Sequence, residues 1–213
     1  MPCMKTYLDE YKAFLFDLDG TLINSEKYHA DGFEHAVEKL SGYRLTPVER
    51  REFFEGHTDE FTPVLAARHG LELDPDEVLN HKRGHVGRHF KAEIFPGVEA
   101  FIEKWRGRMR MALASNSPRC FVKQALVEAR FIDLFESVIT ADDVARRKPD
   151  PEMYELTLKN LKLAPEDVIV FEDSPAGVAA AQAAGCAVAM IENGAGRSVD
   201  GIARYTWKEL NQF

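Results

Sequence analysis

Short runs of apolar residues recur along the chain and predict the strands of a sheet. The first run, Ala13–Phe16, is uninterrupted and ends abruptly in the polar stretch Asp17-Leu18-Asp19-Gly20-Thr21. A strand without polar positions is typical of a parallel sheet that is covered on both faces. Similar runs, which predict the other strands, are Met109–Ala114, Ser137–Thr140, Val168–Phe171 and Ala187–Ile191.

Helical periodicity separates these runs. The segment Val98–Trp105 carries apolar residues at positions i, i+3, i+4 and i+7, and the segment Val122–Ala129 repeats the pattern after Pro118. Such spacing places the apolar side chains on one face of a helix. The alternation of helices and strands predicts an α/β fold with a doubly wound parallel sheet.

The stretch from Asn24 to Lys91 has a different pattern, because it carries helix signals and no convincing strand. Thr46-Pro47-Val48-Glu49 has the form of a capping box with proline at the first helical position, and Asp74-Pro75-Asp76-Glu77 has the same form. We therefore expect residues 24–91 to form an all-helical domain inserted into a core domain of residues 1–23 and 92–213. Phe95-Pro96-Gly97 marks the return of the chain to the core.

Length, charge and cysteine content narrow the class of protein. A chain of 213 residues suffices for one core with one insert. The net charge of −8 would repel nucleic acid and anionic membranes, and no segment has the pattern of a signal peptide or a membrane span. Three cysteines far apart predict neither a disulfide framework nor a thiolate metal site. We expect a cytoplasmic monomer or homodimer.

Acidic side chains follow two of the expected strands. Asp17 and Asp19 come after the first strand, and Glu172 and Asp173 follow the fourth. In a doubly wound sheet both strand ends can meet where ligands bind. Two like charges about 4 Å apart repel by roughly 4 kcal/mol near a protein surface, so this cluster needs a cation or shared protons, and Mg2+ suits it. The alternative is a solvated turn or a helix cap for the first pair and a helix cap for the second.

Two further segments of the chain carry residues that could hold a phosphoryl group. Ser115 and Asn116 end an expected strand and precede a helix, whose N-terminus supplies backbone donors. Lys148 precedes Pro149 in a turn where a cation can neutralise charge. Taken singly, Ser115 has the properties of a helix cap and Lys148 those of a solvated surface charge. Their order along the chain favours the phosphate site.

The motif Asp17-Leu18-Asp19-Gly20-Thr21, followed by Ser115, Lys148 and Glu172-Asp173, resembles the haloacid dehalogenase-like (HAD) superfamily over the whole chain. The helical insert after the first motif is similar to that of one branch of the superfamily, which includes β-phosphoglucomutases and sugar-phosphate phosphatases. The resemblance implies a Rossmann-like HAD core with residues 24–91 as its cap domain. It implies that Asp17 forms an aspartyl-phosphate, that Asp19 is the general acid and base, and that Ser115 and Lys148 hold the phosphoryl group. Mg2+ would be positioned by Asp17, the backbone carbonyl of Asp19, Glu172 and Asp173.

The resemblance also implies contacts with the substrate. Asn116 stands beside Ser115 in the phosphate site. His29 matches a histidine near the nucleophile in the phosphoglucomutase-like branch, with a hinge residue of no chemical role as the alternative. Gly56-His57-Thr58-Asp59 is similar to the cap loop that selects the substrate. Asp59 stands where the mutases carry an arginine for a second phosphate, and an acidic group there favours hydrolysis over mutase chemistry.

These features predict a Mg2+-dependent phosphatase that hydrolyses a small phosphomonoester, such as a sugar or polyol phosphate, through an aspartyl-phosphate. Two alternatives stay open. One is a phosphosugar mutase similar to β-phosphoglucomutase, and the other is a non-catalytic metabolite-binding protein that retains the fold. The expected partner is a small phosphorylated metabolite, with neither nucleic acid nor a membrane as a partner.

A histidine stripe in the insert is a separate feature. His81, His85 and His89 are spaced i, i+4 and i+8 on an expected helix, and such spacing can bind a transition metal. Gly84 and Gly87 weaken that helix, and no cysteine lies near it in sequence. We therefore interpret the stripe as a solvated polar face.

Overall fold

The computed structural model describes residues 7–52 and 58–213, and the chain divides into two compact units. One unit combines residues 1–24 with 92–213, and the other consists of residues 25–91. The second unit thus begins next to the start of the stretch that lacks strand signals. Its role as a cap over a site stays a prediction.

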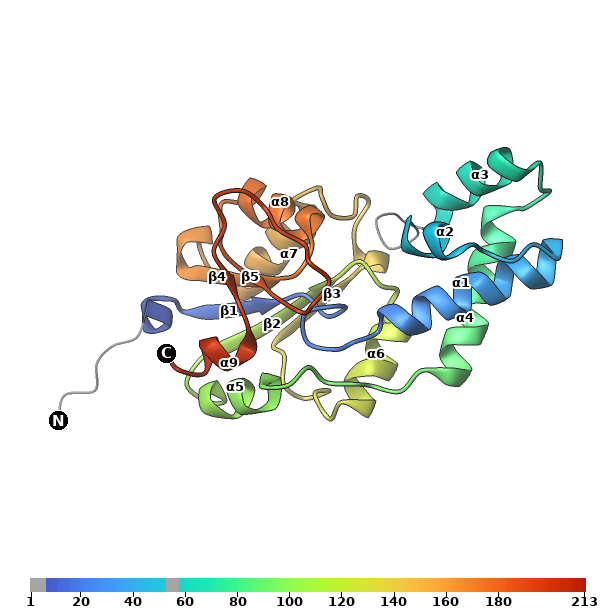
Figure 1. Cartoon of the computed structure of the whole chain (residues 1–213). Coiled ribbons are helices and arrows are strands. Elements are labelled where there is room, and N and C mark those ends of the chain that lie inside the picture. Colours follow the sequence, from blue (N-terminus) through green and yellow to red (C-terminus); the bar gives the residue numbers. More distant parts are fainter. Residues whose placement is uncertain (1–6, 53–57) are drawn as a thin grey trace. The chain divides into compact units, whose positions relative to one another are not determined.

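The first unit is built on a parallel sheet, which has six strands among the described residues, in the order β3-β2-β1-β4-β5-β6 (Figure 1). This confirms the predicted α/β fold with a doubly wound parallel sheet. The expected strands are present to within one residue at either end, and β6 is an additional edge strand too short to give a hydrophobic pattern. The strands are β1 Ala13–Phe16, β2 Arg110–Ser115, β3 Ser137–Thr140, β4 Val168–Glu172, β5 Ala187–Ile191 and β6 Arg204–Tyr205.

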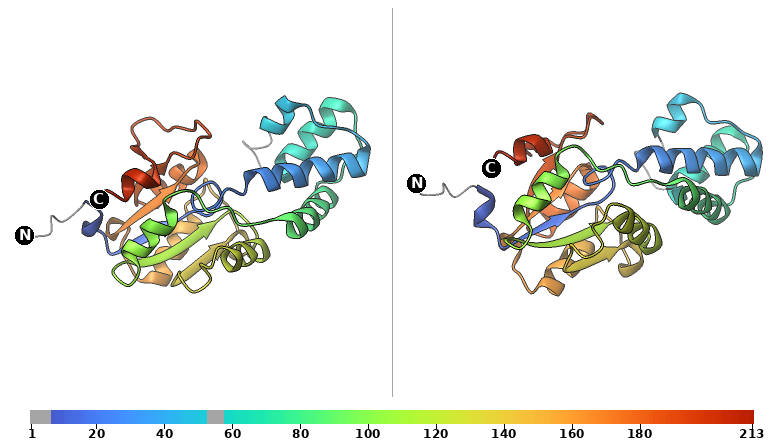
Figure 2. Two further views of the ribbon diagram at one scale, coloured as in Figure 1. Left: turned by 60° about the horizontal axis from the view of Figure 1, so that its bottom comes forward. Right: turned by 90° about the horizontal axis from the view of Figure 1, so that it is seen from below.

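Side chains of β1 alternate between two hydrophobic layers. Leu15 packs in a cluster with residues of α7 (Glu152–Leu161) and α8 (Pro175–Ala183). Phe14 and Phe16 instead contact aromatic rings of α5 (Val98–Trp105), and Phe16 also contacts α9 (Trp207–Leu210). Figures 1 and 2 show these two helix pairs on opposite sides of the sheet. The other helical segments of this unit are η1 Tyr7–Glu10, α6 Arg119–Glu128, η3 Ala141–Asp143 and η4 Pro165–Asp167.

Within the residues that the structure describes, the second unit consists of helices joined by short loops. Its helices are α1 Glu26–Ser41, α2 Pro47–Glu52, α3 Thr58–His69 and α4 Pro75–His89. Both expected caps are present. The backbone N–H of Glu49 donates to Thr46 Oγ1 while Thr46 N–H donates to the Glu49 carboxylate, and Glu77 N–H donates to Asp74 Oδ1. These bonds satisfy N–H groups that have no partner inside the helix, which is why α2 and α4 begin there.

The histidine stripe lies on α4, and its members differ in environment. His89 is exposed, as a solvated polar face requires, whereas His85 is partly buried. The ring of His35 from α1 packs on His85 at 4.4 Å between centroids, and the rings of His85 and His89 stack at 4.2 Å. Burial, together with the two neighbouring rings, lowers the pKa of His85. The ring of His85 therefore contributes to the contact between α1 and α4.

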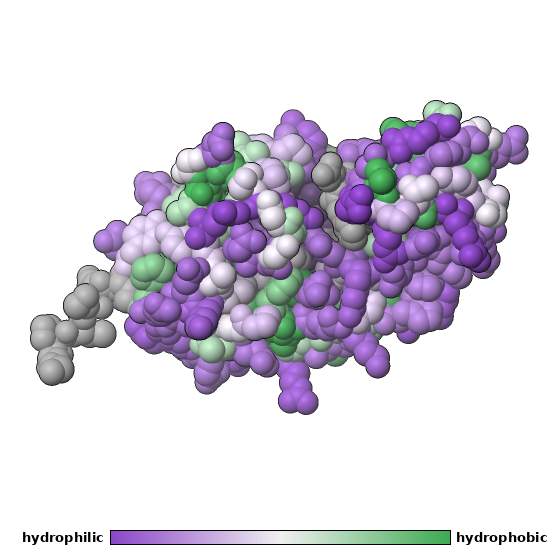
Figure 3. All heavy atoms as spheres, in the orientation of Figure 1, coloured by the Kyte–Doolittle hydropathy of each residue, from purple (hydrophilic) through white to green (hydrophobic). Residues whose placement is uncertain are grey.

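The face shown in Figure 3 is mainly hydrophilic, with small separate apolar patches. Among the helices of the described residues, none has the length and hydrophobicity that crossing a bilayer requires.

Candidate active site

The polar residues at the carboxyl ends of β1, β2 and β4 lie along one edge of the sheet, the edge formed by the carboxyl ends of its parallel strands. Strand β1 pairs with β2 on one side and with β4 on the other, and the register aligns Phe16 with Leu113 and with Phe171. The residues after these three strands therefore leave the sheet side by side. In doubly wound sheets this is where ligands bind, because the crossovers to the two sides diverge there.

Three carboxylates form a buried cluster at this edge. Each of Asp17, Glu172 and Asp173 offers an oxygen within 4.8 Å of the others, and their exposed fractions are 7%, 0% and 2%. Burial raises the pKa of Asp17 well above its usual range, and the charges of Glu172, Asp173 and Asp19 add to this effect. Hard oxygen donors of like charge are the set that a divalent cation such as Mg2+ prefers. The cluster can therefore bind a metal ion.

Lys148 is the cation at the centre of this cluster. Its Nζ donates to Asp17 Oδ1 at 2.7 Å, to Glu172 Oε1 at 2.6 Å and to the carbonyl oxygen of Ala114 at 2.8 Å. Burial lowers the pKa of Lys148, but the charges of Asp17 and Glu172 outweigh burial and raise it well above its usual range. With 3% of its surface exposed, Lys148 is not the solvated surface charge of the alternative interpretation.

Glu172 holds Lys148 in place and is itself held by several donors. Glu172 Oε1 also accepts the hydroxyl of Tyr154 at 2.9 Å, a residue that the sequence analysis did not identify. Glu172 Oε2 accepts the backbone N–H groups of Asp173 and Ser174 and the hydroxyl of Ser174. The same Ser174 hydroxyl accepts the N–H of Gly177 and so caps α8. The helix cap and the acidic cluster, treated above as alternatives, are both present.

Gly177 is required by this packing. A Cβ atom on Gly177 would lie 1.8 Å from Glu172 Oε1, which is closer than any non-bonded contact allows. The first turn of α8 therefore approaches the Glu172 carboxylate closely only because residue 177 has no side chain.

Gly177→Ala is expected to destabilise the first unit by about 1–3 kcal/mol, because the added methyl group must displace the Glu172 carboxylate from Lys148 and Tyr154. Thermal or urea unfolding measures this effect. Gly87→Ala is the matched control, since Gly87 lies in a helix with nothing within 4 Å of an added Cβ. That variant should be neutral or slightly stabilising. Equal stability of the two variants would contradict the packing argument.

Asp19 points to a second set of donors. Asp19 Oδ2 accepts the hydroxyls of Ser115 at 3.2 Å and Ser117 at 2.7 Å. Ser115 is fully buried, and its Oγ accepts the N–H of Ser117 at 3.0 Å. The hydroxyl of Ser115 thus forms a turn and also reaches Asp19. Ser117 was missed, although it follows in the same short run Ser115-Asn116-Ser117.

Asn116 supports the chain at Lys148. Its Oδ1 accepts the N–H of Lys148 at 3.1 Å, and its Nδ2 donates to the Lys148 carbonyl oxygen at 3.3 Å. The expected contact of Asn116 with substrate stays a prediction, whereas its link between the loop after β2 and the loop at Lys148 is part of the structure.

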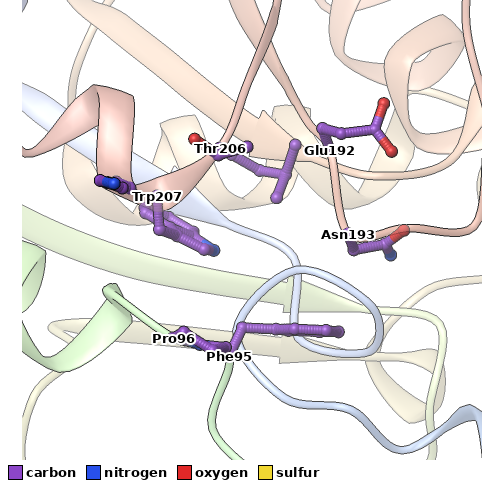
Figure 4. A pocket seen from close by; sticks show the side chains of 8 residues that line it. Phe95, Pro96, Glu192, Asn193, Thr206 and Trp207 are labelled. Carbon is purple, nitrogen blue, oxygen red and sulfur yellow. The ribbon is translucent and has the colours of Figure 1, made fainter.

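The loop after β1 is fixed by the C-terminal part of the chain. Asn193 Nδ2 donates to the carbonyl oxygen of Gly20 at 2.8 Å and to Asp173 Oδ2 at 3.1 Å, and Trp207 Nε1 donates to the carbonyl oxygen of Thr21 at 2.9 Å. Figure 4 shows Asn193 next to this loop. The two donors also line a cavity of about 300 Å³, together with Phe95, Pro96, Ile191, Glu192, Thr206 and Lys208.

The expected substrate contacts of the second unit are placed only in part. His29 lies in α1 and is partly buried. Thr58 begins α3, is buried, and accepts a hydrogen bond from Lys82 Nζ at 2.9 Å, while Asp59 is exposed. Gly56 and His57 lie outside the described residues. Contact of these residues with substrate stays a prediction.

Comparison with known proteins gives consistent matches. The family model of the haloacid dehalogenase-like hydrolases matches residues 11–185. The chain is 32% identical over 190 residues to validoxylamine A 7'-phosphate phosphatase of Streptomyces hygroscopicus subsp. limoneus, covering 82% of this chain and 83% of that protein. It is 33% identical over 185 residues to phosphorylated carbohydrates phosphatase of Thermotoga maritima, covering 82% of each. The solved structure of CbbY from Rhodobacter sphaeroides in complex with phosphate shares the fold, with a TM-score of 0.82 at 24% identity over 94% of this chain and 96% of that one.

Proposed function

Because the chain belongs to the haloacid dehalogenase-like hydrolases, we propose that it is a Mg2+-dependent phosphatase that releases phosphate from a small sugar or polyol phosphate. The observation that carries this proposal is the buried contact of 2.7 Å between Lys148 Nζ and Asp17 Oδ1, inside a cluster of carboxylates. The substrate class is supported by the two relatives, one named for phosphorylated carbohydrates and the other for a 7'-phosphate.

The metal site would be formed by Asp17, Asp173 and the backbone carbonyl of Asp19, with Glu172 beside them. The donor set supports this assignment, because it consists of buried oxygens whose mutual repulsion a divalent cation offsets. When bound, Mg2+ neutralises negative charge on the carboxylates and on the substrate phosphate.

Asp17 is the proposed nucleophile. Its carboxylate oxygen forms a bond to phosphorus while the bond from phosphorus to the ester oxygen breaks, which leaves an aspartyl-phosphate. The charge of Lys148 lowers the pKa of Asp17 against the effect of burial and so favours the ionised carboxylate, and it would stabilise the negative charge that develops on the phosphoryl oxygens. Ser115, at the end of the adjacent strand β2, would assist through its hydroxyl, a role supported by the hydrogen bond of that hydroxyl to Asp19.

Asp19 is the proposed acid and base. It gives a proton to the ester oxygen as that oxygen leaves, and it then takes a proton from the water that attacks the aspartyl-phosphate. The second step releases inorganic phosphate and restores the carboxylate of Asp17. The hydrogen bonds from Ser115 and Ser117 to Asp19 Oδ2 support this role, since they orient the carboxyl group.

Residues 25–91 are the proposed cap. A helical unit inserted directly after the nucleophile loop is suited to exclude bulk water during phosphoryl transfer and to release product afterwards. We assign substrate choice to Gly56, His57, Thr58 and Asp59 of this unit, together with His29. Asn116 would support the phosphate site.

Phosphate release from a panel of sugar and polyol phosphates tests the proposed function. With Mg2+ we expect release from some members, and EDTA should lower the rate by at least about 100-fold. Release that EDTA does not change would contradict the metal requirement. Conversion of a sugar phosphate to its isomer, dependent on a sugar bisphosphate, would instead indicate the mutase. Binding of these compounds without turnover would indicate a non-catalytic protein.

A further inference from the structure

The segment between β5 and β6 brings an arginine onto the acidic cluster. Arg197 Nη1 lies 2.5 Å from Asp173 Oδ2, the oxygen that also accepts Asn193 Nδ2. The side chain of Asp173 is 2% exposed and that of Arg197 is 24% exposed. A buried carboxylate is therefore paired with a guanidinium that still reaches solvent. This arginine belongs to none of the motifs that the sequence analysis identified.

Two cationic side chains contact the carboxylates of the cluster, and each contacts different ones. Lys148 contacts Asp17 and Glu172, and Arg197 contacts Asp173. Glu172 accepts hydrogen bonds at both oxygens from Lys148, Tyr154 and its own neighbours along the chain. Of the three carboxylates, Asp173 is thus the one that pairs with a cation partly exposed to solvent, Arg197.

A divalent cation at Asp17 and Asp173 would share the Asp173 carboxylate with Arg197. The cation and the guanidinium of Arg197 are both positive, and at a buried carboxylate they repel each other strongly, because little water lies between them to screen the interaction. The neutral amide of Asn193 faces no such repulsion. Arg197 also has a route away from the cluster, since part of its side chain is exposed and its backbone carbonyl oxygen is held separately by Arg204 at 3.2 Å.

We propose that Arg197 is a positioning residue that balances the charge of Asp173 and competes with Mg2+ for it, so that Arg197 weakens Mg2+ binding. This inference rests on the proposed Mg2+ site. Without Mg2+, Arg197 stabilises the cluster and holds the segment between β5 and β6 against it. Binding of Mg2+ displaces the guanidinium from Asp173, while Asn193 keeps its hydrogen bonds to Asp173 and Gly20.

Calorimetric titration of the EDTA-treated full chain with Mg2+ tests the competition. Arg197→Ala and Arg197→Gln should both bind Mg2+ about tenfold more tightly than the wild type, because each removes the competing charge. Arg197→Lys keeps the charge and should stay within about threefold of the wild-type Kd. Arg119→Ala is the matched control, since Arg119 is an exposed arginine that pairs with Asp143. It should change the Kd by less than about twofold.

Thermal unfolding provides the readout that separates competition from a purely structural role. Arg197→Ala should unfold at a lower temperature than the wild type in EDTA, and Mg2+ should raise its Tm by more than it raises the wild-type Tm. A residue that only tethers the segment would lower the Tm equally with and without Mg2+. An unchanged or weaker Kd in both neutral variants overturns the proposal. Absence of any Mg2+ binding by the wild type overturns the metal site as well, which distinguishes the two failures.

Discussion

Asp17→Asn is expected to lower the rate of phosphate release by at least about 10⁴-fold, with little change in fold or stability. An amide cannot replace the carboxylate as the attacking group, so no aspartyl-phosphate forms. Asparagine has nearly the same shape as aspartate and keeps an oxygen for Lys148, which retains its contacts with Glu172 and Ala114. Phosphate assays and circular dichroism measure the two parts of this expectation.

Two variants complete the test of Asp17. Asp133→Asn removes the charge of an exposed aspartate outside the cluster and should leave activity unchanged. Asp19→Asn should still form the phosphoenzyme from 4-nitrophenyl phosphate, because this leaving group needs no proton. The phosphoenzyme of this variant should then be hydrolysed slowly, because the base that activates water is missing. Full activity of Asp17→Asn, or loss of its folded structure, would contradict the role of Asp17 as nucleophile.

Lys148→Met is expected to lower the free energy of unfolding by about 3–5 kcal/mol in the absence of Mg2+, because it leaves buried carboxylates without their cation. Methionine fills a similar volume, so the loss reports mainly on charge. Mg2+ should recover part of the stability, since a cation at Asp17 offsets the same repulsion. Urea unfolding with and without Mg2+ measures both effects. Phosphate release should fall by at least about 100-fold in the same variant.

Lys12→Met is the control for Lys148. Lys12 also pairs with an aspartate, Asp167, at 2.9 Å, but the side chain of Lys12 is 64% exposed. Ion pairs of this kind contribute only about 0–1 kcal/mol, because water already solvates both charges. If both lysine variants lost the same stability, the argument that Lys148 compensates buried charge would be wrong.

Much of the fold could be predicted because its signals are local. The run Ala13–Phe16 identified the central strand, and the caps at Thr46 and Asp74 placed the starts of α2 and α4. The C-terminal elements were missed, although Thr206 and Glu209 form a capping box at α9. Strand β6 and helix α9 are too short for the periodicity that revealed the other elements.

Local sequence patterns predicted the turns at site residues but could not predict contacts with residues far away in the chain. Lys148 next to Pro149 has the local pattern of a surface turn, yet its partner Asp17 lies 131 positions away in the chain. Ser115 does form a turn with Ser117, but its contact with Asp19 comes from the pairing of β1 with β2. Local patterns predict the turn but do not predict the partner that lies far away in the chain.

The sequence by itself determined the five longer strands in their order, the helical character of the insert, and the membership in the haloacid dehalogenase-like hydrolases that the family model confirms. It did so because hydrophobic periodicity and the acidic motifs are properties of neighbouring residues. Only the tertiary structure decided that Lys148 and Tyr154 hold Glu172, and that Arg197 pairs with Asp173. These pairs depend on the order of strands in the sheet and on the paths of the loops, which bring distant charges within hydrogen-bond distance and away from water.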